Sequence, residues 1–324
     1  MSAPAATPGA PLALGRRRLR DRVGDGILHV LTAGVTLGAV VLVGLIAYEL
    51  VRHSWAAISE FGLSFITTSV WDPVKEQFGV LDFIWGTALT SLLAVLIAGP
   101  LAIAIALFLT ELAPRPLRSA IGTLVELLAA IPSVVIGLWG IFVLGPFVRD
   151  HVAPVLQDFL GWTPFFKGTP QLTGYLPAVI VLAIMVLPIT ASVARELFGT
   201  VPPDLKEAAL ALGMTRWEMI RGVMIPYTRG GLVAAVMLGL GRALGEAIAV
   251  TQVIGGIGNI TLDLFQNGDT LASRIAAQYQ AAATDIHVSA LVYVGLVLLV
   301  ISLAVNFGAQ LIVRRFELQR SGGS

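Results

Sequence analysis

The chain has 324 residues, of which 56% are hydrophobic and only 13% are charged, and its mean hydropathy is strongly positive. This composition predicts an integral membrane protein. The absence of cysteine excludes disulfide bonds and cysteine-based metal or nucleophile chemistry. None of the lysines (Lys75, Lys167 and Lys206) follows a glycine, so no phosphate-binding loop ending in Gly-Lys is present. Energy from a nucleotide would therefore have to come through another chain.

Six apolar runs are each long enough to cross a bilayer, which takes about 20 helical residues. They lie at Ile27–Val51, Phe83–Leu109, Ser119–Phe147, Leu176–Phe198, Gly231–Ile254 and Val288–Val313. We therefore predict an all-α integral membrane protein with six transmembrane helices. Pro132 is expected to kink the third of these helices and Pro188 the fourth.

The distribution of charge predicts how the chain is oriented. With both termini in the cytosol, most of the 21 lysine and arginine residues fall on the cytosolic side, as the positive-inside rule requires. We predict a disordered, basic cytosolic N-terminus over residues 1–24, a transmembrane domain over 25–316, and a cytosolic tail over 317–324. The connection Arg149–Tyr175 is expected to be an extracytoplasmic loop, and a short amphipathic helix is expected at Leu271–Ala281.

A polar segment, Asp204–Pro226, separates the fourth and fifth predicted spans. Asp204 with Glu207 predicts the N-cap of one short helix, and Thr215 with Glu218 predicts a capping box that begins a second. A glycine between them stands where the first helix would end. The segment is therefore expected to be an ordered cytosolic elbow, and an ordered elbow between spans needs a partner to dock against.

The fifth predicted span contains two ionisable residues, Arg242 and Glu246. An arginine near the middle of a span costs roughly 2.5–3.5 kcal/mol on insertion scales, and a glutamate four residues later lies on the same helix face. Two interpretations remain open. The residues form an ion pair that only neutralises itself inside the bundle, or they face a polar pathway that takes an anion or a partner subunit. No spacing of residues predicts a metal site or a catalytic site.

The elbow sequence EAALALG followed by MTRWEMIRGVMIP is similar to the cytosolic EAA-type loop of ABC importer permeases. In that family the loop forms coupling helices that sit in a groove on the ATPase subunit. The resemblance assigns this role to Glu207, Ala208, Ala209, Gly213 and Pro226. More narrowly, TTSVWDPVKEQFGVLDFIWGT, IPSVVIGLWG and GRALGEAIAVTQVIGG resemble the PstC-type permease of the phosphate-specific (Pst) transporter. The resemblance covers about residues 61–315.

This resemblance implies a type I ABC importer permease fold, with coupling helices between spans four and five. It implies a subunit of the bacterial plasma membrane that helps to import inorganic phosphate, with no cofactor and with ATP hydrolysed by a separate subunit. The implied partners are a PstA-type permease, a PstB-type ATPase homodimer and an extracytoplasmic PstS-type phosphate-binding protein, with no nucleic acid. Arg242 and Glu246 carry over as residues of the substrate pathway.

Three alternatives remain: a permease for another oxyanion such as molybdate or sulfate, the paired PstA-type subunit, and a secondary transporter. The segment with Trp71-Asp72-Pro73 and Phe78-Gly79 favours the PstC type over the PstA type. A secondary transporter would usually show inverted repeats, which are not visible, and would leave the cytosolic elbow unexplained.

Overall fold

The computed structural model describes residues 14–321, with the side chains of 24–311 and of Val313. The chain divides into two compact units after Arg52. The first unit contains most of helix α1 (Leu14–Phe61). Residues 14–24 are helical, so the prediction of disorder was wrong for them, because leucines and arginines that favour helix lead directly into the apolar run. Residues 1–13 lie outside the described residues.

The second unit starts in the last turns of α1 and opens with a short helix and a β-hairpin. In the hairpin Trp71 pairs with Phe78, and Asp72 with Gln77, in an antiparallel register. The first half of the unit contains α2 (Ser64–Thr67), β1 (Trp71–Asp72), β2 (Gln77–Phe78), α3 (Leu81–Leu107), α4 (Arg115–Ala130), α5 (Ser133–Trp139), α6 (Gly145–Phe147) and α7 (Ala153–Leu160). The second half contains α8 (Tyr175–Gly199), α9 (Pro203–Ala211), α10 (Arg216–Met219), α11 (Ile225–Gly245), α12 (Ile248–Val253), α13 (Leu271–Gln278) and α14 (Asp285–Ser321).

Short π-helical or 3-10 turns join several of these helices, so that some consecutive elements form one longer helix. The π turns are Phe108–Leu112, Gly140–Leu144, Val148–Val152 and Ile220–Met224, and the 3-10 turn is Tyr279–Ala281. The amphipathic helix predicted at Leu271–Ala281 is thereby confirmed as α13 followed by the 3-10 turn. The second elbow helix is α10, and the π turn after it joins it to α11. α10 is therefore the first part of the fifth span and not a separate element.

Six helices within the described residues are long and apolar enough to cross a membrane, which confirms the predicted number of spans. They are Gly24–Phe61, Leu81–Leu112, Ser133–Leu160, Tyr175–Gly199, Arg216–Gly245 and Asp285–Leu311. The apolar window of α8 is the most buried of the six. Pro188 lies inside α8, which continues as one helix to Gly199.

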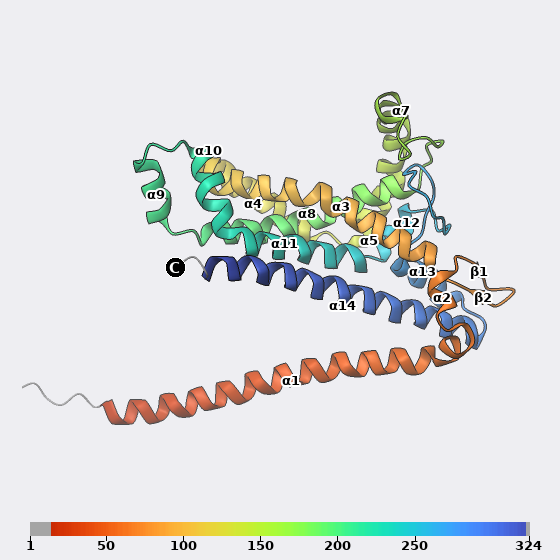
Figure 1. Ribbon diagram of the computed structural model, residues 1–324, viewed down its shortest axis with the longest axis horizontal. Helices are drawn as coiled ribbons and strands as arrows, with labels where there is room; N and C mark the ends of the chain where they lie inside the picture. Colours follow the sequence, from red (N-terminus) through yellow and green to blue (C-terminus); the bar gives the residue numbers. More distant parts are fainter. Residues whose placement is uncertain (1–13, 322–324) are drawn as a thin grey trace, which may run out of the picture. The chain divides into compact units, whose positions relative to one another are not determined.

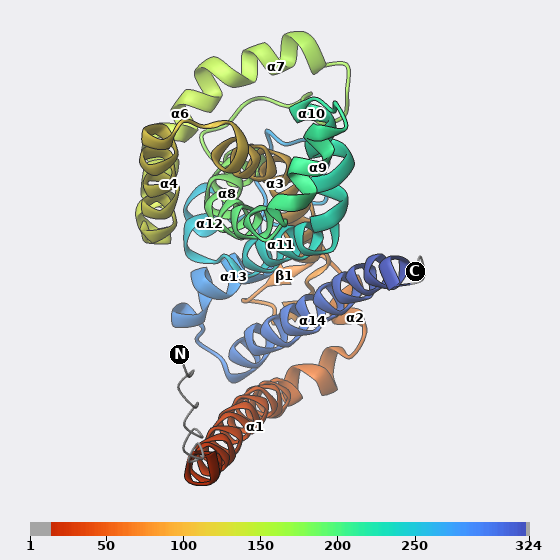
Figure 2. The same cartoon turned by 90° about the vertical axis from the view of Figure 1, so that its left-hand side faces the viewer.

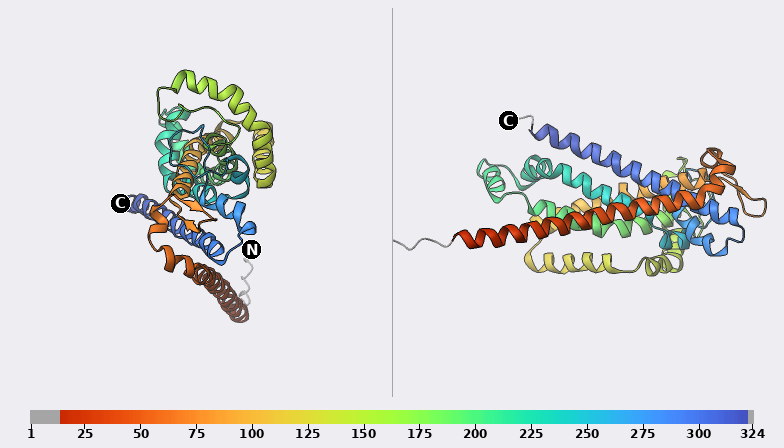
Figure 3. Two further views of the ribbon diagram at one scale, coloured as in Figure 1. Left: turned by 90° about the vertical axis from the view of Figure 1, so that its right-hand side faces the viewer. Right: turned by 90° about the horizontal axis from the view of Figure 1, so that it is seen from below.

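The third predicted span is interrupted at Pro132. α4 ends at Ala130, and Ile131 has an extended backbone with ψ of 126° before α5 begins. A proline disfavours helical geometry in the residue before it, so the expected kink is a complete break. α4 lies at the edge of the bundle, as Figures 2 and 3 show, and the ion pair of Glu126 with Arg195 (2.9 Å) ties it to α8. The connection after Arg149, predicted as a loop, contains α7 and is irregular only beyond it.

α8 lies at the centre of the second unit, and Figure 2 shows α3, α11 and α12 around it. The largest buried apolar cluster joins residues of α3, α5, α8, α11 and α12, among them Ala94, Val181, Leu240 and Val253. Gly239 allows α11 to approach α8 closely, because a Cβ there would lie 2.7 Å from Cγ1 of Val186.

The two ends of the bundle carry different elements. In Figure 1 the elbow helices α9 and α10 lie at one end, while the hairpin and α13 lie at the other. Since the charge distribution assigns the elbow to the cytosol, the hairpin and α13 lie on the outer side. α11 runs from the elbow toward the outer side. It thus connects the elbow to Arg242 and Glu246, the two places in which the sequence predicts functional residues.

Candidate functional site

Arg242 and Glu246 lie where α11 ends. The helix stops at Gly245, and Glu246 has an extended backbone (φ −73°, ψ 113°) before α12 begins. One uninterrupted span over Gly231–Ile254 was therefore a wrong prediction. The Glu246 carboxylate accepts a long hydrogen bond of 3.4 Å from the backbone N–H of Ala249, in the first turn of α12, whose N-cap is Ala247.

The two charges of this pair are held very differently. Nη2 of Arg242 lies 3.9 Å from Oε2 of Glu246, which is beyond hydrogen-bond distance. The Arg242 side chain is 40% exposed and the Glu246 side chain 10%. Among the side chains that the structure describes, none makes a hydrogen bond to the guanidinium of Arg242. The carboxylate thus has one long hydrogen bond to α12, while the guanidinium, which no described side chain holds, can turn toward another anion.

An open pocket of about 570 Å³, which we call the Arg242 pocket, contains both charges. Residues from α8, α11 and α14 line it: Ile189, Leu238, Gly241, Arg242, Gly245, Glu246 and Asn306. It therefore combines one cation, one anion and one amide on otherwise apolar walls. A guanidinium in such surroundings is suited to bind an oxyanion, because its N–H groups form a planar fork of donors.

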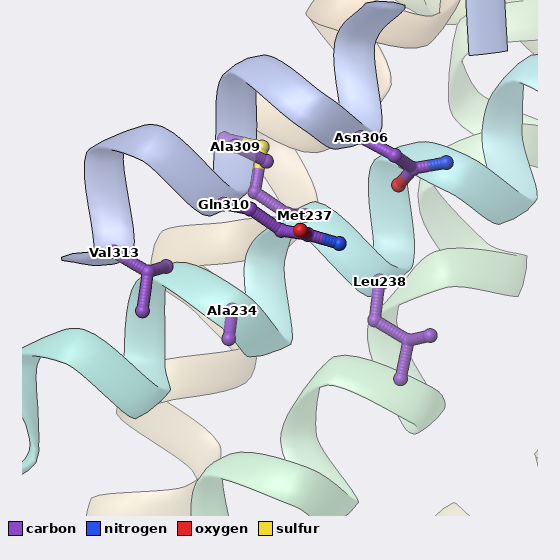
Figure 4. Close-up of a pocket in the computed structure, with 7 residues that line it drawn as sticks. All are labelled: Ala234, Met237, Leu238, Asn306, Ala309, Gln310 and Val313. Carbon is purple, nitrogen blue, oxygen red and sulfur yellow. The ribbon is translucent and has the colours of Figure 1, made fainter. Parts of the chain in front are cut away.

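A second pocket of about 400 Å³, the Gln310 pocket, adjoins the first between α11 and α14. The two pockets share Leu238 and Asn306. Figure 4 shows Asn306 and Gln310 on α14, with Met237 and Leu238 on the facing α11. The complete lining is Ala234, Met237, Leu238, Asn306, Ala309, Gln310 and Val313.

The elbow is capped at both of the predicted inner positions. Gly213 has a φ of +83°, and the backbone N–H of Met214 donates to the carbonyl of Ala209 at 3.2 Å, which closes α9 in a Schellman motif. Thr215 and Glu218 form the predicted capping box. The predicted N-cap at Asp204 was wrong. Because the ring of Pro203 fixes a helical φ and so begins the helix, Asp204 already lies inside the first turn.

The family-assigned elbow residues differ in exposure. Glu207, Ala208, Gly213 and Pro226 are exposed, while Ala209 is buried against the body of the protein. Large apolar side chains are also exposed on the elbow, namely Leu205, Leu210, Leu212 and Trp217. A cytosolic surface that carries this many exposed apolar side chains beside polar ones is typical of a protein–protein contact.

The inner side of the elbow is fixed to the cytosolic end of α3. Nζ of Lys206 lies 2.6 Å from Oε1 of Glu111, and both side chains are mostly buried, at 22% and 17% exposure. Nη1 of Arg216 donates to the backbone carbonyl of Glu111 at 3.4 Å. Apolar contacts reinforce this attachment in a cluster that includes Ala106, Phe198, Ala209, Met219 and Met224. The elbow is therefore attached to the end of the second span as well as to the spans that it joins.

The structure also contains a buried ion pair that sequence reasoning missed. Nη2 of Arg274, on α13, lies 2.6 Å from Oδ2 of Asp269 and donates to the carbonyl of Gly256 at 3.1 Å. The guanidinium lies over the rings of Phe83 and Trp71, at 4.5 and 5.7 Å. The sequence carried one signal for this pair: Arg274 lies on the predicted amphipathic helix, and Asp269 stands just before that helix.

Several groups stabilise Asp269 in its buried position. Its carboxylate also accepts hydrogen bonds from the backbone N–H of Thr270 and from the hydroxyl of Ser273. Burial raises the pKa of Asp269 above its ordinary value, and these donors together with Arg274 oppose that effect. The cluster lies on the outer side and contains no part of the Arg242 pocket.

The segment with Trp71-Asp72-Pro73 forms the β-hairpin. Nε1 of Trp71 donates to Oε1 of Gln278 at 2.7 Å, which joins the hairpin to α13. The backbone N–H of Lys75, with that of Val74, donates to the Asp72 carboxylate and holds its pKa below the ordinary value. The hairpin is thus a structural element of the outer end.

A family model and the curated relatives of this chain agree on one family of transport proteins. Residues 98–318 match the family described as binding-protein-dependent transport system inner membrane component. The chain is 46% identical to the phosphate transport system permease protein PstC of Mesorhizobium japonicum, over 91% of this chain and 90% of that protein. It is 45% identical to the PstC protein of Haemophilus influenzae, over 90% and 94%.

Solved structures share the fold at lower identity. A chain of the MetNI methionine ABC transporter superposes with a TM-score of 0.58 at 19% identity, covering 76% of this chain and 99% of that one. A chain of a bacterial alginate ABC transporter, solved with an alginate pentasaccharide-bound periplasmic protein, gives 0.61 at 19% identity, with coverage of 91% and 96%.

The fold, the elbow and these matches define the class as the membrane-spanning permeases of ABC importers, and the predicted permease fold is confirmed. As the family description and the six apolar helices indicate, the chain is an inner-membrane protein. Within this class, the chain belongs to the PstC family of phosphate transport system permease proteins.

Proposed function

We propose that this chain is the membrane-spanning permease subunit of an ATP-driven importer, and that it moves inorganic phosphate across the plasma membrane. The relatives named as phosphate transport permeases match along about nine-tenths of the chain, which supports this substrate. The observation that carries the proposal is the Arg242 pocket, because it offers a loosely held guanidinium at the end of α11 to an oxyanion.

Arg242 and Glu246 would act together on the anion. The guanidinium binds phosphate oxygens through charge-assisted hydrogen bonds. Glu246, which accepts a long hydrogen bond from α12, lies close enough to balance the charge of Arg242 whenever the pocket is empty. The same carboxylate weakens the hold of Arg242 on phosphate, so that the anion can leave again.

The elbow would be the coupling element. Glu207, Ala208 and Gly213 are exposed on it, as are the apolar side chains of Leu212 and Trp217. Docking in a groove of the ATPase would cover these side chains, and closure of the ATPase would then move the elbow as a rigid body. In this scheme the chain hydrolyses no ATP itself and uses no cofactor.

The complete importer would contain four kinds of subunit. We infer a heterodimer with a PstA-type permease, which would cover the open side of the Arg242 pocket. A PstB-type ATPase homodimer would bind the elbows, and a PstS-type phosphate-binding protein would deliver the anion on the outer side. The alginate transporter solved together with its periplasmic protein supports an assembly of this general kind.

Substrate-stimulated ATPase activity of the reconstituted importer tests the proposal. The complex in proteoliposomes is supplied with its binding protein and with phosphate, sulfate or molybdate. We expect phosphate to stimulate ATP hydrolysis and to accumulate inside the vesicles, while sulfate and molybdate do neither. Equal or stronger stimulation by sulfate or molybdate would assign the permease to that oxyanion instead.

A further inference from the structure

Asn306 and Gln310 are polar residues in the apolar sixth span, and neither the resemblance nor the charge analysis assigns them a role. They are four residues apart, so they lie on one face of α14. Both are exposed in the isolated chain. Figure 4 shows their side chains leaving α14 and extending in the same direction.

Asn306 lies next to the charged pair. It lines the Arg242 pocket together with Arg242 and Glu246, and it also lines the Gln310 pocket. Its side-chain oxygen lies beside Gly241, because a Cβ built on that glycine would be 3.8 Å away. The Asn306 amide therefore faces α11 at Gly241, the residue that precedes Arg242 in the sequence.

Neither amide has a hydrogen-bond partner among the side chains and backbone groups that the structure describes. A free amide at membrane depth is unfavourable against lipid, since hydrocarbon offers it neither a donor nor an acceptor. Polar residues inside a span therefore face a polar path or a partner. For Asn306 the polar path is already present, because it shares a pocket with both charges.

We propose that Asn306 is a further anion-contacting residue of the pathway, and this rests on the proposed phosphate import. Its amide nitrogen donates to an oxygen of the anion that Arg242 binds. Its carbonyl oxygen accepts a hydrogen bond from the hydroxyl that phosphate carries at neutral pH and sulfate lacks. A site built to hydrogen-bond a substrate hydroxyl discriminates against analogues without it, so Asn306 contributes to specificity as well as to binding.

Two substitutions separate contact with the anion from a purely structural role. Asn306→Asp keeps the shape of the side chain but replaces the donor with a negative charge that repels phosphate. Asn306→Leu removes both hydrogen-bonding groups without adding charge. Contact with the anion predicts that uptake falls in both and falls further in Asp, whereas a role in packing predicts that the isosteric Asp is tolerated better.

The measurement is phosphate uptake by the complete importer in proteoliposomes, with complex assembly checked for every variant. We expect uptake to fall about tenfold in Asn306→Leu, the size of one lost hydrogen bond to a charged group, and further in Asn306→Asp. Phe307→Leu, at the next position on α14 and outside both pockets, is the control and should transport normally.

Uptake within twofold of wild type in both variants, or a smaller loss in Asp than in Leu, would overturn the assignment of Asn306. The test also separates this inference from the proposed function. If the wild-type complex accumulates phosphate and Arg242→Gln does not, normal uptake in the Asn306 variants refutes only the role of Asn306. If the wild-type complex fails to accumulate phosphate, the proposed function itself fails.

Discussion

Arg242 with Glu246 and Arg274 with Asp269 are the same kind of pair in two different settings. The Arg274 pair is 2.6 Å long, and its side chains are 10% and 2% exposed. The Arg242 pair is 3.9 Å long, with side chains 40% and 10% exposed. Arg274 is also covered by two aromatic rings, whereas Arg242 lines an open pocket. The charge of Arg274 is paired within the protein and so contributes to the fold. The charge of Arg242 has no close partner among the described side chains and is therefore available to a ligand.

The largest effect is expected on removing the buried arginine. Arg274→Met leaves Asp269 buried without its counter-ion, and breaking a buried pair in this way typically costs about 3–5 kcal/mol of the free energy of unfolding. Thermal unfolding of the purified complex in detergent, with the yield of assembled complex, measures this loss.

Arg149→Met is the matched control for that experiment. Arg149 also lies 2.6 Å from its partner Asp150, but the two side chains are 42% and 48% exposed. We expect no measurable loss of stability, because exposed ion pairs contribute little. If the two variants were equally destabilised, contact distance and not burial would determine the contribution of a pair.

The next largest effect concerns the open pair, and it should appear in transport and not in stability. Arg242→Gln removes a guanidinium that makes no hydrogen bond to the described side chains, so the free energy of unfolding should change by less than about 1 kcal/mol. Phosphate uptake should fall at least about tenfold, because a charge-assisted contact to the anion is lost. Thermal unfolding and vesicle uptake on the same preparation give both values, and a large loss of stability with normal uptake would reverse the comparison.

The sequence was sufficient for the parts of the fold that depend on local pattern. Apolar runs of spanning length predicted the number of spans. Local sequence motifs predicted the capping box of Thr215 with Glu218 and the end of the first elbow helix at Gly213. Breaks were harder to predict. Pro132 was read as a kink, and the end of α11 at Gly245 was missed, because Glu246 and Ala247 carry no strong signal that stops a helix.

The site was predictable only where an unusual residue stood in an apolar run. Arg242 and Glu246 were selected as candidates in this way, because their charge is costly in a span, and their role in transport stays a prediction. Asn306 is uncharged, and its position beside Gly241 depends on how α14 packs against α11. The pair of Arg274 with Asp269 was missed for a similar reason, since residues in a polar outer connection look solvated until tertiary packing buries them.

A third pair, Lys206 with Glu111, sharpens the comparison because it is as short as the Arg274 pair but less deeply buried. Its length is 2.6 Å, and its side chains are 22% and 17% exposed. It also differs in place, since it joins the elbow to the π turn that follows α3. Reversing one charge, in Lys206→Glu or in Glu111→Lys, should loosen this joint while the apolar contacts of Ala209 and Met219 keep the elbow folded.

We therefore expect the single reversals to lower the phosphate imported per ATP hydrolysed severalfold, which corresponds to a pair interaction of roughly 0.5–1.5 kcal/mol. The double variant, with both charges exchanged, restores the attraction and should recover most of the wild-type ratio. Uptake and ATP hydrolysis measured on the same vesicles give that ratio directly. If the double variant were no better than the single ones, the elbow would act on α3 through its apolar contacts alone. Recovery would show instead that the closed ion pair of Lys206 with Glu111 transmits motion between the elbow and the second span. The open pair at Arg242 would differ from it, because its arginine interacts with the transported anion.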